Sequence, residues 1–135
     1  MRILKSQKGS ILVELVVVSM LLVMFVLGTI EVFNVVRADI YLHKIVREGA
    51  REAALTGNTG AGDGMARNIK NQYFASSSDV ALSPIYFGQS AKGETANVVC
   101  EASYFYKHFS FLNKKGVGVT ELNARAIYPW WDKTS

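Results

Sequence analysis

The chain has 135 residues, with 15 Lys and Arg against 11 Asp and Glu, and half of its residues are hydrophobic. This length suits one modest domain and excludes a large multidomain enzyme. A single cysteine excludes an intramolecular disulfide, and with only two histidines the sequence predicts no Cys/His metal cluster.

The net charge of +4 is concentrated at one end of the chain. Arg2, Lys5 and Lys8 lie within the first nine residues, where there is no acidic side chain. The remaining 126 residues hold 12 basic and 11 acidic side chains. The basic balance therefore reflects a short charged tip, and we expect no nucleic-acid partner.

An apolar run follows the charged tip. Residues 10–30, SILVELVVVSMLLVMFVLGTI, contain one ionisable side chain, Glu14. As a helix this run is about 30 Å long, which matches the hydrocarbon thickness of a bilayer. The preceding positive charges predict a single pass with the N-terminus in the cytoplasm and the rest of the chain outside it.

Other interpretations of this run remain open. A buried core helix would need a larger domain to cover it on all faces. A cleaved secretory signal would need a site near Val26-Leu27-Gly28, which is a poor match to the small-x-small pattern. An uncleaved anchor with no further role is the third possibility. None of these explains Glu14.

Glu14 is costly within a spanning helix, at roughly 2.5–3.5 kcal/mol in mid-membrane. Cleavage between Gly9 and Ser10 would give Ser10 a free amine, mostly protonated at neutral pH. Ser10 and Glu14 are four residues apart and therefore share one face of a helix. The amine could neutralise Glu14 of its own chain, or pair with Glu14 of a neighbouring subunit and fix the register between helices.

Three short motifs surround the apolar run: GSILVEL at residues 9–15, LGTIEV at 27–32 and VREGAREAA at 46–54. In this order they resemble the TadE-like pseudopilins of tight-adherence pili, relatives of the type IV pilins. Many members carry a proline within the apolar run. This chain has Ser19-Met20 there instead, so it lacks the proline that would kink the helix.

The resemblance implies a processing site and a set of partners. A prepilin peptidase would cut after Gly9, Ser10 would become the first residue, and Glu14 would be the fifth residue of the mature chain. The leader would be residues 1–9, with Arg2, Lys5 and Lys8 as its charges. The implied partners are other pilin or pseudopilin subunits, the assembly machinery and membrane lipid. The implied location is the bacterial inner membrane, with a C-terminal periplasmic domain.

The helical pattern continues beyond the apolar run, over residues 31–55. One stripe of small or apolar residues has helical spacing: Ala38, Leu42, Ile45, Gly49 and Ala53. Charged residues occupy most of the other positions. We expect a sheet to pack on this stripe, and a helix of another subunit is the alternative. The result is one continuous helix from about Ser10 to Ala54.

The rest of the chain predicts a small α+β domain, residues 65–135, after a Gly-rich connection at 56–64. A short helix from about Gly64 to Phe74 would be capped by Asp63. Ser76-Ser77-Ser78 reads as a linker. Alternation predicts strands at 97–107 and 119–128, and Pro84 confines a weaker strand at 80–87 to an edge. The turn between the two longer strands is expected at Lys114, Lys115, Gly116 and Gly118. The fold class is α+β, with the outer half of the long helix on a small antiparallel sheet, as in pilins.

Few residues outside the apolar run suggest chemistry. Cys100 falls on the apolar face of its strand and is expected to be buried. His43 and His108 have no catalytic partner at a suitable spacing, so the sequence predicts no enzyme and no cofactor. Trp130-Trp131 is expected to pack at the terminus. Core packing accounts for most of one aromatic cluster: Tyr104, Phe105, Tyr106, Phe109 and Phe111.

Two hypotheses follow for the function. The first is a structural subunit, a minor pilin or pseudopilin of a tight-adherence-type pilus with a role in biogenesis, adhesion or secretion. The second is a single-span membrane-anchored binding module that never assembles. The two differ in the first residue of the mature chain, which is Ser10 for the subunit and Met1 or about Thr29 for the anchored module.

Overall fold

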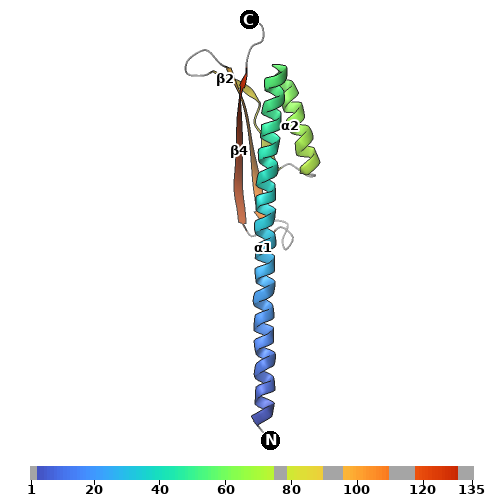
Figure 1. Ribbon diagram of the computed structural model, residues 1–135, viewed down its shortest axis with the longest axis vertical. Coiled ribbons are helices and arrows are strands. Elements are labelled where there is room, and N and C mark those ends of the chain that lie inside the picture. Colours follow the sequence, from blue (N-terminus) through green and yellow to red (C-terminus); the bar gives the residue numbers. More distant parts are fainter. Residues whose placement is uncertain (1–2, 75–78, 90–95, 110–117, 131–135) are drawn as a thin grey trace. The chain divides into compact units, whose positions relative to one another are not determined.

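A computed structural model describes residues 3–74, 79–89, 96–109 and 118–130 (Figure 1). Two helices precede a four-stranded sheet, which confirms the α+β class. In chain order the elements are α1 (Ile3–Thr56), α2 (Thr59–Tyr73), β1 (Val80–Leu82), β2 (Tyr86–Gln89), β3 (Ala96–His108) and β4 (Gly118–Trp130). The chain divides into two compact units, Met1–Asn34 and Val35–Ser135.

The first unit is the N-terminal part of helix α1. The predicted helix from Ser10 to Ala54 is confirmed, because α1 contains all of it without interruption. It is also helical through Ser19 and Met20. Since no proline lies between residues 3 and 56, no backbone donor is missing from the hydrogen-bond ladder of the helix.

The sheet of the second unit is antiparallel and centred on β3. Along its whole length β3 pairs with β4, from Ala96 opposite Trp130 to His108 opposite Gly118. On its other edge β3 pairs with β1 and β2 in succession. The weak strand predicted at residues 80–87 consists of two short edge strands, β1 and β2, with Pro84 between them. Proline has no N–H to donate to the sheet, so the strand is interrupted at this residue. Within the described part of the chain, β4 pairs only with β3.

The predicted stripe on α1 forms the core of this unit. Ala38, Leu42, Ile45, Gly49 and Ala53 are all buried. Leu42 and Ala53, with Val46 and Ala50 between them, form one buried cluster with the β3 residues Val98, Cys100 and Ala102. The expectation that a sheet covers this stripe is therefore confirmed.

Helix α2 corrects the prediction of a Gly-rich connection. It begins at Thr59, so most of the predicted connection at 56–64 is helical, and the cap is Asn58 instead of Asp63. The Asn58 side chain accepts a hydrogen bond from Gly60 N at 2.8 Å. Gly57, with φ +66°, and the cap residue Asn58 separate the two helices.

The glycines of α2 have a packing role. A Cβ built on Gly62 would lie 2.5 Å from the carbonyl oxygen of Gly49 and 2.6 Å from the Ala53 Cβ. Gly49 in turn has Ala66 and Cys100 as close neighbours. The small residues of α1 thus contact α2 of the same chain as well as the sheet, a contact the sequence analysis did not consider.

The strands differ from their predicted bounds by one or two residues. Gly118 is the first residue of β4 instead of part of a turn, and β4 continues through Pro129 to Trp130. Pro129 is tolerated because, among the described residues, no strand pairs with the other edge of β4 and no donor is needed there. Ser76-Ser77-Ser78, Phe111, Lys114, Lys115, Gly116 and Trp131 lie outside the described residues.

Candidate functional site: the apolar N-terminal helix

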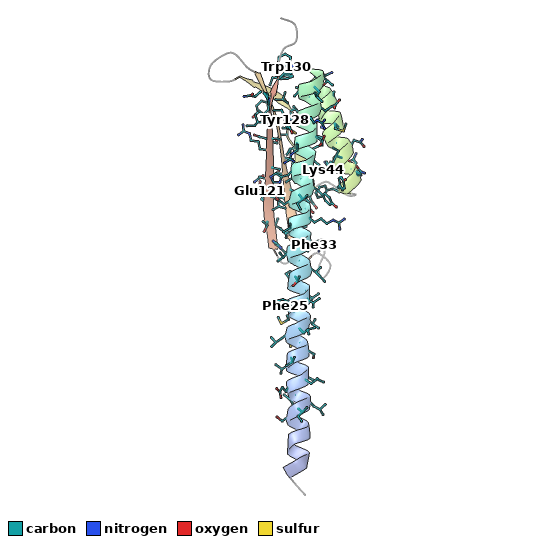
Figure 2. The ribbon with its side chains drawn as sticks, in the orientation of Figure 1. Phe25, Phe33, Lys44, Glu121, Tyr128 and Trp130 are labelled. Atoms are coloured by element: carbon teal, nitrogen blue, oxygen red, sulfur yellow. The ribbon has the colours of Figure 1, made fainter. Side chains whose placement is uncertain are left out.

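The apolar side chains of the first unit project from both sides of α1 around Phe25 (Figure 2). The apolar residues from Ile11 to Val26 are 45–76% exposed, and Phe25 is the most exposed of them. Across the described residues, α1 is the one helix long and apolar enough to cross a membrane, and none of its most apolar window is buried. Uncovered apolar surface all around a helix is expected where lipid is the solvent.

Two of the polar side chains in this run are satisfied within the helix. The Ser19 hydroxyl donates to the carbonyl oxygen of Val16 at 2.8 Å. The Thr29 hydroxyl donates to that of Phe25 at 2.9 Å. Because these donors have acceptors one turn away, neither needs water or a second chain, and both are compatible with hydrocarbon.

Glu14 differs from these two residues. Its side chain is exposed and forms no hydrogen bond or ion pair with any described residue. Ser10 lies four residues earlier in the same helix, so the two residues share a face. The arrangement places a carboxylate one helical turn from the proposed new N-terminus and leaves it available for a positive partner.

Gly9 is helical, and a Cβ built on it would meet nothing within 4 Å. Glycine inside a helix costs about 1 kcal/mol relative to alanine. The packing of the described chain therefore does not explain this glycine, whereas Gly62 is explained by its close contacts.

The leader charges are described only in part. Lys5 and Lys8 belong to α1 by their backbone, and their side chains are not described. Arg2 lies outside the described residues. The structure thus places Gly9, Ser10 and Glu14 on one continuous helix.

The cysteine, the two histidines and the terminal tryptophan each contact neighbouring residues of the fold. Cys100 is 1% exposed, as predicted, and burial raises its pKa to about 11. His43 lies beside Asp39 on the surface of α1. His108 is 2.7 Å from the Thr120 hydroxyl. The Trp130 ring packs against Phe87, 5.2 Å between centroids, as expected of terminal packing. In the described ranges no three of His, Cys, Asp and Glu gather as a metal site.

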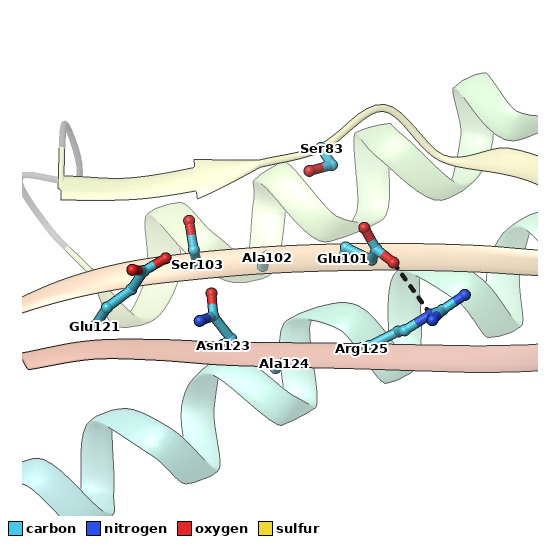
Figure 3. A pocket seen from close by; sticks show the side chains of 8 residues that line it. All are labelled: Ser83, Glu101, Ala102, Ser103, Glu121, Asn123, Ala124 and Arg125. Atoms are coloured by element: carbon cyan, nitrogen blue, oxygen red, sulfur yellow. Dashed lines mark ion pairs between the residues drawn. The ribbon is translucent and has the colours of Figure 1, made fainter.

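A polar groove of about 370 Å³ lies on the exposed face of the sheet (Figure 3). Glu101 of β3 and Arg125 of β4 point toward each other across it, with 3.1 Å between Oε1 and Nε. The other lining residues are Ser83, Ala102, Ser103, Glu121, Asn123 and Ala124. The groove offers hydrogen-bonding groups, but neither a histidine nor a cysteine lines it.

Tyrosines and cations of α1 and α2 form a cluster that was not predicted from the sequence. Arg37 Nε donates to the Tyr41 hydroxyl at 3.1 Å, and Lys44 Nζ donates to the Tyr73 hydroxyl at 2.8 Å. The two tyrosine rings stack 4.3 Å apart. The spacing of Arg37, Tyr41 and Lys44 on one helix face was a visible signal, but the contribution of Tyr73 depends on the fold.

Comparison with known families gives a match at the N-terminal helix. The model of the family described as TadE-like protein matches residues 9–51, which is 43 of 135 residues. Neither the curated proteins nor the solved structures contain a match to this chain. The match begins at Gly9 and spans the apolar run and most of the third motif. Residues 9–51 are therefore a TadE-like segment, as the resemblance of the three motifs predicted.

Proposed function

We propose that the chain is a minor pilin or pseudopilin of a tight-adherence-type pilus, with a role in pilus biogenesis, adhesion or secretion. TadE-like proteins form a structural, pilus-related family, and the TadE-like segment contains the apolar helix. In this proposal the chain spans the bacterial inner membrane once. Its N-terminus is cytoplasmic and its second unit is periplasmic until the subunit enters a filament.

One observation carries the proposal. The apolar run at residues 10–30 has uncovered side chains and contains one carboxylate, Glu14, which has no partner among the described residues. That carboxylate follows Ser10 by four residues, and the family match starts at the residue before Ser10.

The proposed processing step supplies the missing charge. Hydrolysis of the Gly9–Ser10 bond by a prepilin peptidase leaves a carboxylate on Gly9 and an amine on Ser10. Since a protease needs an extended substrate and α1 is helical here, the low helix propensity of Gly9 eases local unwinding. The protonated amine then offsets the cost of Glu14, first within one chain and later between neighbouring helices.

Sequencing the N-terminus of the protein extracted from membranes tests this step. The proposal expects Ser10 as the first residue. A chain that begins at Met1 or near Thr29 would instead support a membrane-anchored binding module and would contradict processing by a prepilin peptidase.

Replacing Glu14 by Ala or Gln tests the assembly role. We expect insertion and cleavage to continue and incorporation into filaments to fall about 100-fold, since the Ser10 amine is left without its partner at a cost of about 3 kcal/mol. Ser19→Ala is the matched control, because the Ser19 hydroxyl is satisfied within its own helix. Immunoblots of sheared pili and of membranes measure both fractions, and normal pili with Glu14→Ala would refute the role.

A further inference from the structure

The cluster of Arg37, Tyr41, Lys44 and Tyr73 carries two positive charges. The Tyr73 hydroxyl raises the pKa of Lys44 most, and only Glu48 among the described carboxylates adds to this effect, without an ion pair. Neither Arg37 nor Lys44 forms an ion pair with a described acidic residue. The nearby acids have other neighbours: Asp39 lies 3.6 Å from His43, and Glu48 lies 3.5 Å from Arg51. The terminal nitrogens of Arg37 therefore remain available to an anion.

Apolar side chains are exposed beside these cations. Val36 is 50% exposed and Ile40 is 59% exposed, on the same helix as Arg37 and Tyr41. The Arg37 guanidinium carbon lies 5.4 Å from the centroid of the Tyr41 ring, so the ring supports the long side chain. Exposed aliphatic residues beside tyrosine and arginine are typical of a membrane interface, where one end of the side chain is apolar and the other is wet.

The position of Arg37 in the chain suits such an interface. It follows Ile30, the last residue of the predicted span, by seven residues. Seven residues of helix rise about 10 Å. The headgroup region adds about 5–8 Å on each side of the hydrocarbon. Because side chains on a helix lean toward its N-terminus as a rule, the length of the Arg37 side chain brings the headgroup phosphates within its reach.

We propose that Arg37, positioned by Tyr41, binds the phosphate of a phospholipid headgroup in the leaflet at the Ile30 end of the span. Lys44 adds a second positive charge, so net-anionic headgroups such as phosphatidylglycerol are preferred over zwitterionic ones. The inference rests on the membrane span and holds whether or not the chain assembles into a pilus.

The test uses the full-length chain in nanodiscs that contain equal amounts of phosphatidylglycerol and phosphatidylcholine. Native mass spectrometry of the released protein gives the ratio of the two bound lipids. We expect Arg37→Gln to lower the preference for phosphatidylglycerol about fivefold, since one cation near the surface is worth about 1 kcal/mol. Arg47→Gln is the matched control. Arg47 is also exposed and unpaired among the described residues, but it lies ten residues, or about 15 Å, further along the helix.

Each other outcome overturns the inference. An equal loss with Arg47→Gln would show a general charge effect, and a preference abolished by millimolar inorganic phosphate would show a free-anion site. A change in oligomeric state without a change in lipid ratio would show that the cluster contacts a second chain. If the protein retains neither lipid, the predicted membrane span is wrong. If it retains both lipids in equal amounts, only the role of Arg37 is refuted.

Discussion

The contact between Gly62 of α2 and Gly49 of α1 decides how closely the two helices approach. With a Cβ on Gly62 only 2.5 Å from a backbone oxygen, the neighbour is a part of the chain that moves with difficulty. Gly64, two residues later in the same helix, has nothing within 4 Å of its built Cβ. There is therefore no room for a methyl group at Gly62, whereas there is room for one at Gly64.

Gly62→Ala is expected to destabilise the second unit by about 1–3 kcal/mol, because the methyl group forces the helices apart. Gly64→Ala is the matched control and is expected to stabilise it by about 0.5–1 kcal/mol through higher helix propensity. Chemical denaturation of the full chain in detergent, followed by near-UV circular dichroism, measures both. Equal effects of the two substitutions would show that the close contact does not limit packing.

Cys100 links burial to pH dependence. Burial raises its pKa from an ordinary value of about 9 to about 11, so the thiol stays protonated in the folded protein at pH 10. The stabilising effect of this shift is present below pH 9 and is lost as the pH rises from 9 through 11. We expect the loss to be on the order of 2 kcal/mol at pH 11.

The difference in unfolding free energy between the wild type and Cys100→Ala, measured from pH 8 to pH 11, isolates this contribution. A difference that is constant across the range would contradict the shifted pKa. Alkylation of Cys100 at pH 8 should likewise be slow until the protein unfolds, because the thiolate is the reactive species.

At the scale of the element, the start of α2 shows how a helix forms in a Gly-rich sequence. Asn58 caps the first turn, while Asp63 lies within the helix and pairs with Arg67 at 2.7 Å on the surface. Capping satisfies a backbone donor that would otherwise have no partner, and an exposed ion pair contributes little.

Asn58→Ala is therefore expected to cost about 1 kcal/mol of unfolding free energy, and Asp63→Ala at most about 0.5 kcal/mol. Thermal unfolding of both variants measures the difference. A larger loss with Asp63→Ala would indicate that the helix starts later, where the sequence alone had placed it.

At the scale of the whole molecule, the charge placement predicts the orientation in the membrane. Replacing Arg2, Lys5 and Lys8 by Gln is expected to lower the fraction of chains with an external C-terminal domain by about half, since the positive flank is lost. Protease protection in spheroplasts measures this fraction. The control replaces Arg51, Arg67 and Arg125, which lie in the second unit and form surface ion pairs. An unchanged fraction in the first variant would contradict the predicted topology.

Sequence reasoning succeeded where the determining contacts are local. The α1 stripe follows from a period of 3.6 residues, and β3 and β4 follow from alternation, so both were predicted within a few residues. The start of α2 was wrong because glycines normally interrupt helices, and only the approach of α1 explains Gly62. Gly9, Ser10 and Glu14 form a local motif, whereas the Tyr73 contact with Lys44 exists only once α2 folds back on α1.

In the part of the chain that the structure describes, β4 pairs with β3 alone and leaves its other edge open. In the second unit, β4 runs in the same direction as α1 (Figure 1). Two copies that joined through β4 in a symmetric antiparallel ladder would have their helices pointing in opposite directions. Such a ladder would close the open edge of β4 in both copies, which is the way exposed strands drive edge-to-edge association.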